Sequence, residues 1–317
     1  MTINLLSKHR NSLMAIAMIW VAIRHSNFPM IINKAVNFVL VHCGYAGADA
    51  FVFLSGFGIY YACKKEPKYW DFIKRRLIRI LPYSVAVCLL LFAIGSISLK
   101  DVFVNGFGLA IWFRIDWVYW YVSFILLMYL LTPFYMKLFK KNPYLVTVLG
   151  IGLVSLLCCF LSSRNVYIFF RTNLYLLGIL FAHINDKKPE TKMWWTLIPM
   201  VFGFVLQYYL IHYVGNNTLY TPPFLLAIPG VMCLSAWIID KLKFVQKPLA
   251  WLSKYSFLFY LIHEEIVSLL YLNYAVLYRP GIYFDWLINI VAIVIALLIS
   301  ILIKKVIDYS IKIIMRT

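Results

Sequence analysis

The sequence predicts an all-α fold, a polytopic membrane helix bundle of about ten transmembrane helices with both termini cytoplasmic. Its 317 residues are 63% hydrophobic and only 13% charged, and the mean hydropathy is +0.83. Soluble domains, in contrast, are about 45–50% apolar and about 25% charged. The apolar runs have helical length, whereas the strands of a membrane barrel are about ten residues long and alternate in polarity. Both observations indicate an integral membrane protein built of helices.

Ten apolar runs are long enough to cross a bilayer, for which about 20 residues suffice. We expect spans at about 11–32, 44–63, 80–98, 117–138, 143–161, 166–183, 193–213, 222–240, 249–271 and 284–305. The segments between them are too short to fold alone, so a single membrane domain over residues 1–317 is expected. The first run carries Arg24 and His25 where a secretory signal would need an apolar core and a cleavage site, so we interpret it as a helix.

Lys and Arg residues in the connecting segments set the expected orientation. With the N-terminus inside, the inner segments carry 23 of these cations and the outer segments carry five, which predicts cytoplasmic termini. The formal net charge of +18 comes from cations at the ends of apolar runs, so nucleic acid is not expected as a partner. The six cysteines show no metal-binding spacing, so no metal site is expected.

The first run, Met14 to His25, is apolar but ends on two ionisable residues, Arg24 and His25. Counted from Arg10 at the expected inner edge, His25 lies about 22 Å along a helix, past the middle of a hydrocarbon core about 30 Å thick. Ionisable groups at such a depth are costly and usually mark a functional site. His25 is either such a residue or a core histidine packed against a neighbouring helix, and this run alone favours neither.

The second run begins with GYAGADAFVFLSGFGIYY at 44–61, which is rich in small residues. Asp49 lies near its outer end and Ser55 near its middle. Small residues let another helix or a ligand approach closely, and ordinary helix packing accounts for them equally well. A carboxylate inside the membrane should be paired or functional, and Arg24 or His25 at a similar depth is the expected partner of Asp49.

The segment KKEPKYWDFIKRRLIRILP at 64–82 alternates aromatic or aliphatic residues with cations. This pattern predicts a basic amphipathic helix on the inner face that ends at Pro82. Attraction to lipid headgroups explains such a helix. A phosphate site explains it too, because Arg76 and Arg79 are three residues apart on one side of the helix and paired guanidinium groups suit polyphosphates.

Aromatic and cationic residues also occur in the fourth and sixth runs. Trp120 and Tyr121 form either an aromatic belt at the outer interface or a surface that stacks on a sugar ring. Arg171 lies about one turn inside the outer edge of its span, where its long side chain could also reach the interface.

The ninth run, WLSKYSFLFYLIHEEIVSLLY, holds three consecutive ionisable residues: His263, Glu264 and Glu265. The histidine falls near the middle of the span, and the glutamates fall in its outer half. Adjacent residues on a helix are about 100° apart, so the two carboxylates cannot point the same way. One of them is expected to pair with Arg171 or Arg24, either in a structural group of ion pairs or in a functional site.

Four stretches resemble a known family. GADAFVFLSGFGI (47–59) is similar to the GVDLFFVLSGFLI stretch of membrane acyltransferase family 3, and FIKRRLIRILP (72–82) is similar to the basic RRxxRxxP loop of that family. WYVSFILLMYLLTP (120–133) extends the likeness, as does YSFLFYLIHEE (255–265), which is similar to the SYxxYLxH segment. The resemblance covers essentially the whole chain, and members of the family O-acylate cell-surface glycans.

The resemblance implies a transmembrane O-acyltransferase that moves an acyl group, most often acetyl, from cytoplasmic acyl-CoA to a hydroxyl of an extracytoplasmic polysaccharide or lipid-linked glycan. Acetyl-CoA would be a co-substrate, and no permanently bound cofactor is implied. The expected location is a bacterial inner or plasma membrane, with membrane lipids as further partners. In the family's first helix, Arg or Lys is followed after ten residues by His; His25 matches the histidine, whereas Met14 stands at the cation position.

The expected catalytic roles follow from the chemistry of acyl transfer. His25 acts as a general base on the sugar hydroxyl or as a brief acyl carrier. Asp49 or Glu264 orients its ring, and Arg171 or Arg24 stabilises the oxyanion. The residues expected to bind acyl-CoA are Arg75, Arg76 and Arg79. The residues expected to line the substrate site are Arg24, Ser55, Trp120, Tyr121, Tyr260, His263 and Glu265.

Two other functions fit the sequence. A transporter or flippase for a lipid-linked sugar also needs buried charges near a site in the membrane, but it does not need the inner arginines as a nucleotide site. An inactive member of the family with a scaffolding role is the third possibility, because Met14 replaces the usual cation.

Overall fold

The structure is a computed structural model of the chain. It describes residues 1–25, 43–65, 68–113, 119–160, 166–214, 221–275 and 282–314. Within these ranges the secondary structure is helical, apart from an isolated antiparallel bridge between Thr2 and Lys192. The all-α class predicted from composition is therefore confirmed. The outer end of the first predicted span, 26–32, lies outside the described residues.

The chain divides into two compact units, which are described separately below. The first unit comprises Met1–Ala17, Tyr45–Ile73 and Leu127–Ser253, and the second comprises Met18–Gly44, Lys74–Leu126 and Lys254–Thr317. The division falls within three α-helices, which are α2 (Arg10–His25), α5 (Tyr69–Ala93) and α8 (Trp120–Phe139), and within two 3-10 helices, Cys43–Tyr45 and Ser253–Tyr255.

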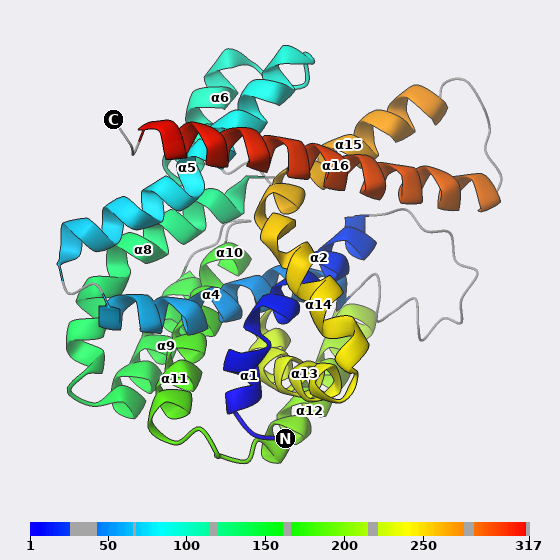
Figure 1. Ribbon diagram of the computed structural model, residues 1–317. Helices are drawn as coiled ribbons and strands as arrows, with labels where there is room; N and C mark the ends of the chain where they lie inside the picture. The colour runs from blue at the N-terminus through cyan, green and yellow to red at the C-terminus, as the bar shows by residue number, and fades with distance from the viewer. Residues whose placement is uncertain are drawn as a thin grey trace. The chain divides into compact units, whose positions relative to one another are not determined.

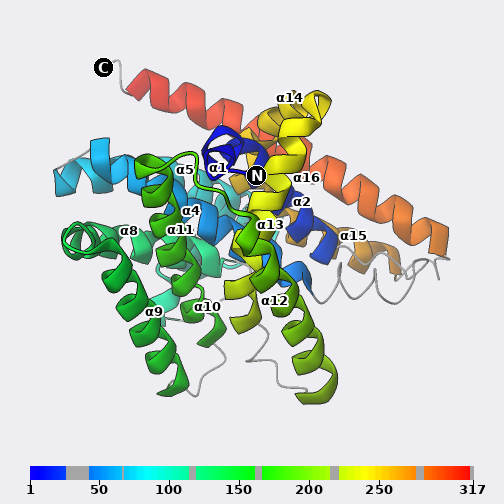
Figure 2. The same cartoon turned by 90° about the horizontal axis from the view of Figure 1, so that it is seen from below.

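The first unit contains two close helix pairs, α4 with α11 and α12 with α13. Figure 1 shows α4 beside α11, and Figure 2 shows α12 running along α13. Its helices are α1 (Asn4–Lys8), α4 (Ala46–Lys65), α9 (Pro143–Phe160), α10 (Val166–Phe170), α11 (Thr172–Lys187), α12 (Leu197–Tyr209), α13 (Pro222–Lys241) and α14 (Lys243–Leu252). A short π-helical segment, Leu210–Val214, follows α12 directly.

The second unit is centred on α15 (Ser256–Ala275), which packs along α16 (Ile282–Ile314). It also contains the short helices α6 (Leu99–Gly106) and α7 (Ala110–Phe113). The start of α6 is fixed by a capping box, in which the side chains of Ser98 and Asp101 each accept a hydrogen bond from the other's backbone N–H.

Eight helices in the described ranges are long and apolar enough to cross a membrane. They correspond to eight of the ten predicted spans: Cys43–Lys65, Tyr69–Ala93, Trp120–Phe139, Pro143–Phe160, Ile168–Lys187, Trp194–Val214, Pro222–Lys241 and Leu287–Ile313. The described part of the first predicted span is α2, with 16 residues. The ninth predicted span, 249–271, is interrupted by a 3-10 turn at Ser253–Tyr255, so that α14 ends before α15 begins.

The prediction that the basic helix ends at Pro82 is wrong, because α5 continues through this proline from Tyr69 to Ala93. Proline lacks an N–H group and so removes one hydrogen bond of the helix. Membrane helices tolerate this loss, because neighbouring groups and small backbone adjustments satisfy the freed carbonyl. The amphipathic segment and the following apolar span are therefore one helix.

The helices α4 and α11 approach each other at two glycines. A Cβ added to Gly56 would lie 2.1 Å from the backbone oxygen of Tyr175, and a Cβ added to Gly178 would lie 2.1 Å from that of Phe53. Both positions are therefore closed to any larger residue. Contacts of this kind allow weak Cα–H···O hydrogen bonds between helices, as in other small-residue crossings in membranes.

Contacts along this pair show that α4 and α11 run in the same direction. Asp49 binds Arg171 near the start of both helices. The hydroxyl of Tyr60 donates to Asp186, and Lys64 binds the same carboxylate, near the end of both. The second and sixth predicted spans were expected to run from outside to inside, and the parallel arrangement agrees with this order.

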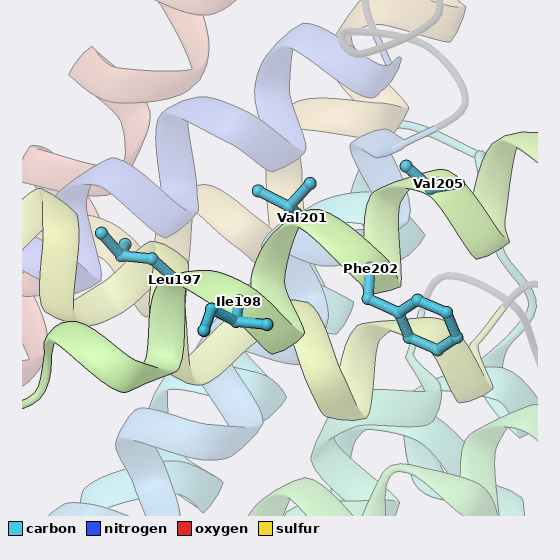
Figure 3. Close-up of a pocket in the computed structure, with 5 residues that line it drawn as sticks. All are labelled: Leu197, Ile198, Val201, Phe202 and Val205. Atoms are coloured by element: carbon cyan, nitrogen blue, oxygen red, sulfur yellow. The ribbon is translucent and has the colours of Figure 1, made fainter.

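The outward side of α12 is apolar. Figure 3 shows Leu197, Ile198, Val201, Phe202 and Val205 along this side, where they line a shallow pocket. The four residues after Leu197 in this set are each more than half exposed in the isolated chain. Such exposure is expected of side chains that face lipid hydrocarbon rather than water.

We predict that Gly178→Ala destabilises the protein by about 1–3 kcal/mol or more, because the added methyl group forces α11 away from the backbone of α4. Gly152→Ala on α9 is the matched control, since a Cβ there meets nothing within 4 Å. It should be neutral or slightly stabilising, by about 0.5–1 kcal/mol. Denaturant unfolding in detergent micelles measures both effects, and equal stability of the two variants would contradict the close crossing.

Candidate functional site

Two groups of polar side chains contain residues that the sequence predicted for the site, one group in each unit. In the second unit His25, His263 and Glu264 form a group that we call the imidazole cluster. In the first unit Asp49 and Arg171 form a buried ion pair. The sequence predicted all five residues as site residues, and each group is described within its own unit.

His25 is the last residue of α2, and Glu264 lies on α15. The Nδ1 atom of His25 lies 3.4 Å from Oε1 of Glu264. This separation is longer than a strong charge-assisted hydrogen bond, and catalytic contacts are often long in structures without substrate. A carboxylate at Nδ1 favours the tautomer with hydrogen on that atom, which leaves Nε2 as the basic nitrogen. Both side chains are about one-third exposed, at 33% and 39%.

His263 precedes Glu264 and is 2% exposed. Its Nδ1 atom lies 3.0 Å from the carbonyl oxygen of Phe259 and 2.9 Å from that of Tyr260. Its ring meets the His25 ring edge to face, with centroids 5.2 Å apart and an interplanar angle of 81°. The ring of Phe259 stacks on it at 5.3 Å and 11°. His263 is therefore held by its own helix and by rings from two helices.

Aromatic side chains of α8 and α15 continue the cluster. Tyr121 and Tyr260 have ring centroids 5.3 Å apart, and Trp120 lies 5.8 Å from Tyr121. All three are less than 9% exposed. Burial separates Trp120 and Tyr121 from a lipid-facing aromatic belt, which was one of the two expectations for them.

Arg24 adjoins His25 in the sequence and passes closely over Gly44. A Cβ added to Gly44 would lie 2.5 Å from Cβ and Cδ of Arg24, so glycine makes room for this side chain. Arg24 also lies within electrostatic reach of Glu264. Glu265 is half-buried and points to a different side of α15, as expected for adjacent helical positions.

The buried ion pair corrects the expected pairing of Asp49. We expected Arg24 or His25 as its partner, but the Nε atom of Arg171 donates to Oδ1 of Asp49 at 3.0 Å, and the two side chains are 3% and 1% exposed. Asp49 lies in the first turn of α4, where the helix dipole favours a negative charge. Arg171 directly precedes α11. The close approach of these two helices therefore sets the pair.

A second arginine, Arg10 of α2, contacts the middle of α4. The Nε atom of Arg10 donates to the backbone oxygen of Leu54 at 3.0 Å, and a Cβ added to Gly58 would lie 2.4 Å from its guanidinium. Ser55, the next residue after Leu54, is 8% exposed. The guanidinium of Arg10 therefore packs against α4 in the space that the absent side chain of Gly58 leaves. Arg10 precedes Met14 by one turn of α2.

The arginines predicted to bind acyl-CoA lie on α5. Arg75 and Arg79 are exposed, and Arg76 is half-buried. One turn after Arg79, the hydroxyl of Tyr83 donates to Asp308 of α16. Lys304 of α16 binds the same carboxylate at 3.0 Å. The basic side of α5 thus borders a polar contact with the last helix of the second unit.

Sequence reasoning missed a polar network at the C-terminal ends of α4 and α11 in the first unit. The hydroxyl of Tyr60 donates to Asp186 at 3.0 Å and lies 3.2 Å from Nδ1 of His183. Lys64 reaches both oxygens of Asp186 at 2.9 Å. The partners are separated by a nearly constant 122 to 126 residues in the sequence. This spacing indicates a network only once α4 and α11 are known to pair. Among the described residues, no group of three or more His, Cys, Asp or Glu side chains could hold a metal ion.

We predict that Arg171→Met destabilises the protein by about 3–5 kcal/mol, because it leaves the charge of Asp49 buried without compensation. Arg171→Met combined with Asp49→Leu should recover most of that loss, since replacing both charges by apolar groups is often neutral. Denaturant unfolding of both variants in micelles is the measurement. Simple addition of the two single losses would contradict a structural ion pair.

Comparison of the chain with curated proteins and with solved structures gave no match. The chain does match the model of a protein family described as an acyltransferase domain, of the acyltransferase 3 type, over residues 12–305. This match spans most of α2, the basic helix α5, the imidazole cluster and most of α16. The chain therefore belongs to membrane acyltransferase family 3, the family that its four motifs resemble.

Proposed function

We propose that the protein transfers an acyl group, acetyl in the first place, from cytoplasmic acyl-CoA to a hydroxyl of an extracytoplasmic polysaccharide or lipid-linked glycan. Membership of the acyltransferase family supports the reaction type. The single structural observation that carries the proposal is the contact of His25 with Glu264 and His263. With the Glu264 carboxylate at Nδ1, the ring of His25 can be oriented and Nε2 left as its basic nitrogen, which is the arrangement used to activate a hydroxyl.

In this proposal His25 is the general base. Its Nε2 atom takes the proton of the acceptor hydroxyl while the oxygen attacks the thioester carbonyl, so that the new C–O bond forms. Glu264 keeps hydrogen on Nδ1 and stabilises the imidazolium that results. The C–S bond then breaks, and the proton passes from His25 to the sulfur of the departing CoA. In the alternative, His25 carries the acyl group briefly before the hydroxyl attacks.

A positive group must stabilise the oxygen that becomes negative during the attack. Within the second unit, Arg24 has the charge and adjoins His25 in the chain. Arg171 belongs to the first unit, where its Nε atom binds Asp49. We propose Arg24 for this role, with Asp49 and Arg171 holding the start of α4 against α11.

The substrates would be bound by two different surfaces. The exposed cations of α5 suit the phosphates of acyl-CoA, because guanidinium groups bind phosphate oxygens in pairs. The rings beside the imidazole cluster suit the apolar face of a sugar, and His263 and Glu265 complete the proposed lining. A bacterial inner or plasma membrane, with its lipids, is the proposed location, and O-acetylation of cell-envelope polysaccharide is the proposed process.

We predict that His25→Ala abolishes the consumption of acetyl-CoA by purified protein supplied with a glycan acceptor. General base catalysis alone contributes about 10²–10⁴-fold, so turnover should fall by at least that factor. His212→Ala is the matched control, because His212 is an exposed histidine in the π-helical segment after α12. Undiminished turnover in a His25→Ala protein that still inserts into membranes would remove His25 from the mechanism.

We predict that Arg76→Ala combined with Arg79→Ala removes saturable binding of CoA, because the phosphates lose their paired guanidinium groups. Lys140→Ala combined with Lys141→Ala removes the same charge from exposed positions at the end of α8 and should leave binding unchanged. Calorimetric titration in micelles is the measurement. Absence of CoA binding in the unsubstituted protein, together with intact export of a lipid-linked sugar, would favour a flippase instead.

A further inference from the structure

A side-chain contact joins the basic helix α5 to α16, the last helix of the second unit. The hydroxyl of Tyr83 donates a hydrogen bond to the carboxylate of Asp308. Lys304 binds the same carboxylate at 3.0 Å, and its ammonium group lies 5.2 Å from the centre of the Tyr83 ring. These contacts show which side of each helix is turned toward the other.

The side of α5 that faces α16 carries arginines. Residues on a helix are about 100° apart, so Arg76 lies about 20° around α5 from Tyr83, and Arg79 lies about 40° from it in the other direction. Arg79 is one turn away and within electrostatic reach of the Tyr83 hydroxyl. Two of the three arginines proposed to bind acyl-CoA are therefore turned toward α16.

The side of α16 that faces α5 carries lysines. Lys312 lies about 40° around α16 from Asp308, and Lys305 lies about 60° from it in the same direction. These two lysines therefore form one stripe beside the contact with Tyr83. Both are exposed, and neither is paired with a carboxylate in the described ranges. Lys304 differs from them, because it is already bound to Asp308.

Positive charge is in excess around this contact. Four cations, two on each helix, flank a carboxylate that Lys304 already compensates. The helix dipole favours a cation in the last turn of α16, which accounts for Lys312 but not for Lys305, two turns earlier. The expected orientation places the beginning of α5 and the end of α16 inside, where acyl-CoA is supplied. The excess charge therefore suits a cytoplasmic ligand with several phosphates.

We propose that α16 forms the second side of the acyl-CoA site, with Lys305 and Lys312 binding the ribose 3′-phosphate while Arg76 and Arg79 bind the diphosphate. The inference rests on the proposed function, which names acyl-CoA as the donor. CoA carries its phosphates in two places, a diphosphate and a separate phosphate monoester on the ribose. Two helices that present cations toward each other can bind both places at once.

The two kinds of cation match the two kinds of phosphate. The planar guanidinium of arginine binds two oxygens at once, which suits the linked phosphates of the diphosphate. A phosphate monoester carries about −1.5 to −2 charges at pH 7, and two flexible lysines can approach it as point charges. The contact between Tyr83 and Asp308 holds the lysine stripe beside the arginines.

Dephospho-CoA, which lacks only the 3′-phosphate, tests the proposal without turnover. Calorimetric titration in neutral detergent micelles should show that the unsubstituted protein binds CoA about tenfold or more tightly than dephospho-CoA, because a hydrogen bond to a charged group is worth at least that factor. Lys305→Ala combined with Lys312→Ala should weaken the binding of CoA by the same factor and leave that of dephospho-CoA unchanged. Lys305→Arg combined with Lys312→Arg should keep the preference for CoA.

Two further pairs of substitutions separate this site from general electrostatics. Arg76→Ala combined with Arg79→Ala should weaken the binding of both ligands alike, since both contain the diphosphate. Lys140→Ala combined with Lys141→Ala removes the same charge from exposed positions just after α8 and should change neither affinity. Thermal unfolding should be the same for the lysine variants, because all the lysines concerned are exposed.

Equal affinities for CoA and dephospho-CoA in the unsubstituted protein would overturn the inference, as would an equal loss of both ligands in the alanine variant of α16. Lipid headgroups offer the same phosphate chemistry. If native mass spectrometry shows that this variant retains fewer phosphatidylglycerol molecules while its preference for CoA persists, the lysines bind lipid and the inference is wrong. Absence of binding of either nucleotide would overturn the proposed donor as well, whereas selective binding of CoA without acetyl transfer would overturn the proposed function alone.

Discussion

The close crossing of α4 and α11 is the constraint on which the described structure of the first unit depends. Gly56 and Gly178 bring each backbone against a carbonyl oxygen of the other helix, which no larger residue permits. This approach allows polar contacts at both ends of the pair, with Asp49 bound at one end and Asp186 at the other. The hydrophobic effect does not drive helices together inside a lipid bilayer, so close packing and polar contacts must stabilise their association.

In the imidazole cluster, the free-energy cost of burying a polar side chain is offset in a different way. A histidine inside a membrane must satisfy its polar atoms, and His263 does so at one nitrogen with carbonyl oxygens of its own helix. Glu264, the next residue, turns by about 100° and reaches His25 instead. Two consecutive residues of α15 thus contact the same histidine in different ways, one through a ring and one through a carboxylate.

Composition and motifs predicted the helical class, the family and most of the helix positions, because run length and residue type are local properties. Two boundaries were missed for reasons that lie outside local sequence. Pro82 is tolerated inside α5, and the turn at Ser253–Tyr255 divides a continuous apolar run. The partner of Asp49 was also missed, since depth in the membrane does not reveal which helices touch. The contact of His263 with the carbonyl oxygens of its own helix depends on side-chain orientation, which no sequence pattern encodes.

The two sides of α12 differ in what they allow evolution to change. Its outward residues, such as Ile198 and Phe202, remain more than half exposed in the described chain. Hydrocarbon tails adapt to any apolar shape, so leucine, valine and phenylalanine should exchange there freely during divergence. Gly203 lies against the backbone of α13, and a methyl group at this position would meet the oxygen of Pro223 at 2.7 Å. Substitution rates along α12 should therefore vary with the period of the helix, about 3.6 residues. The positions with the highest rates would identify the side that faces lipid.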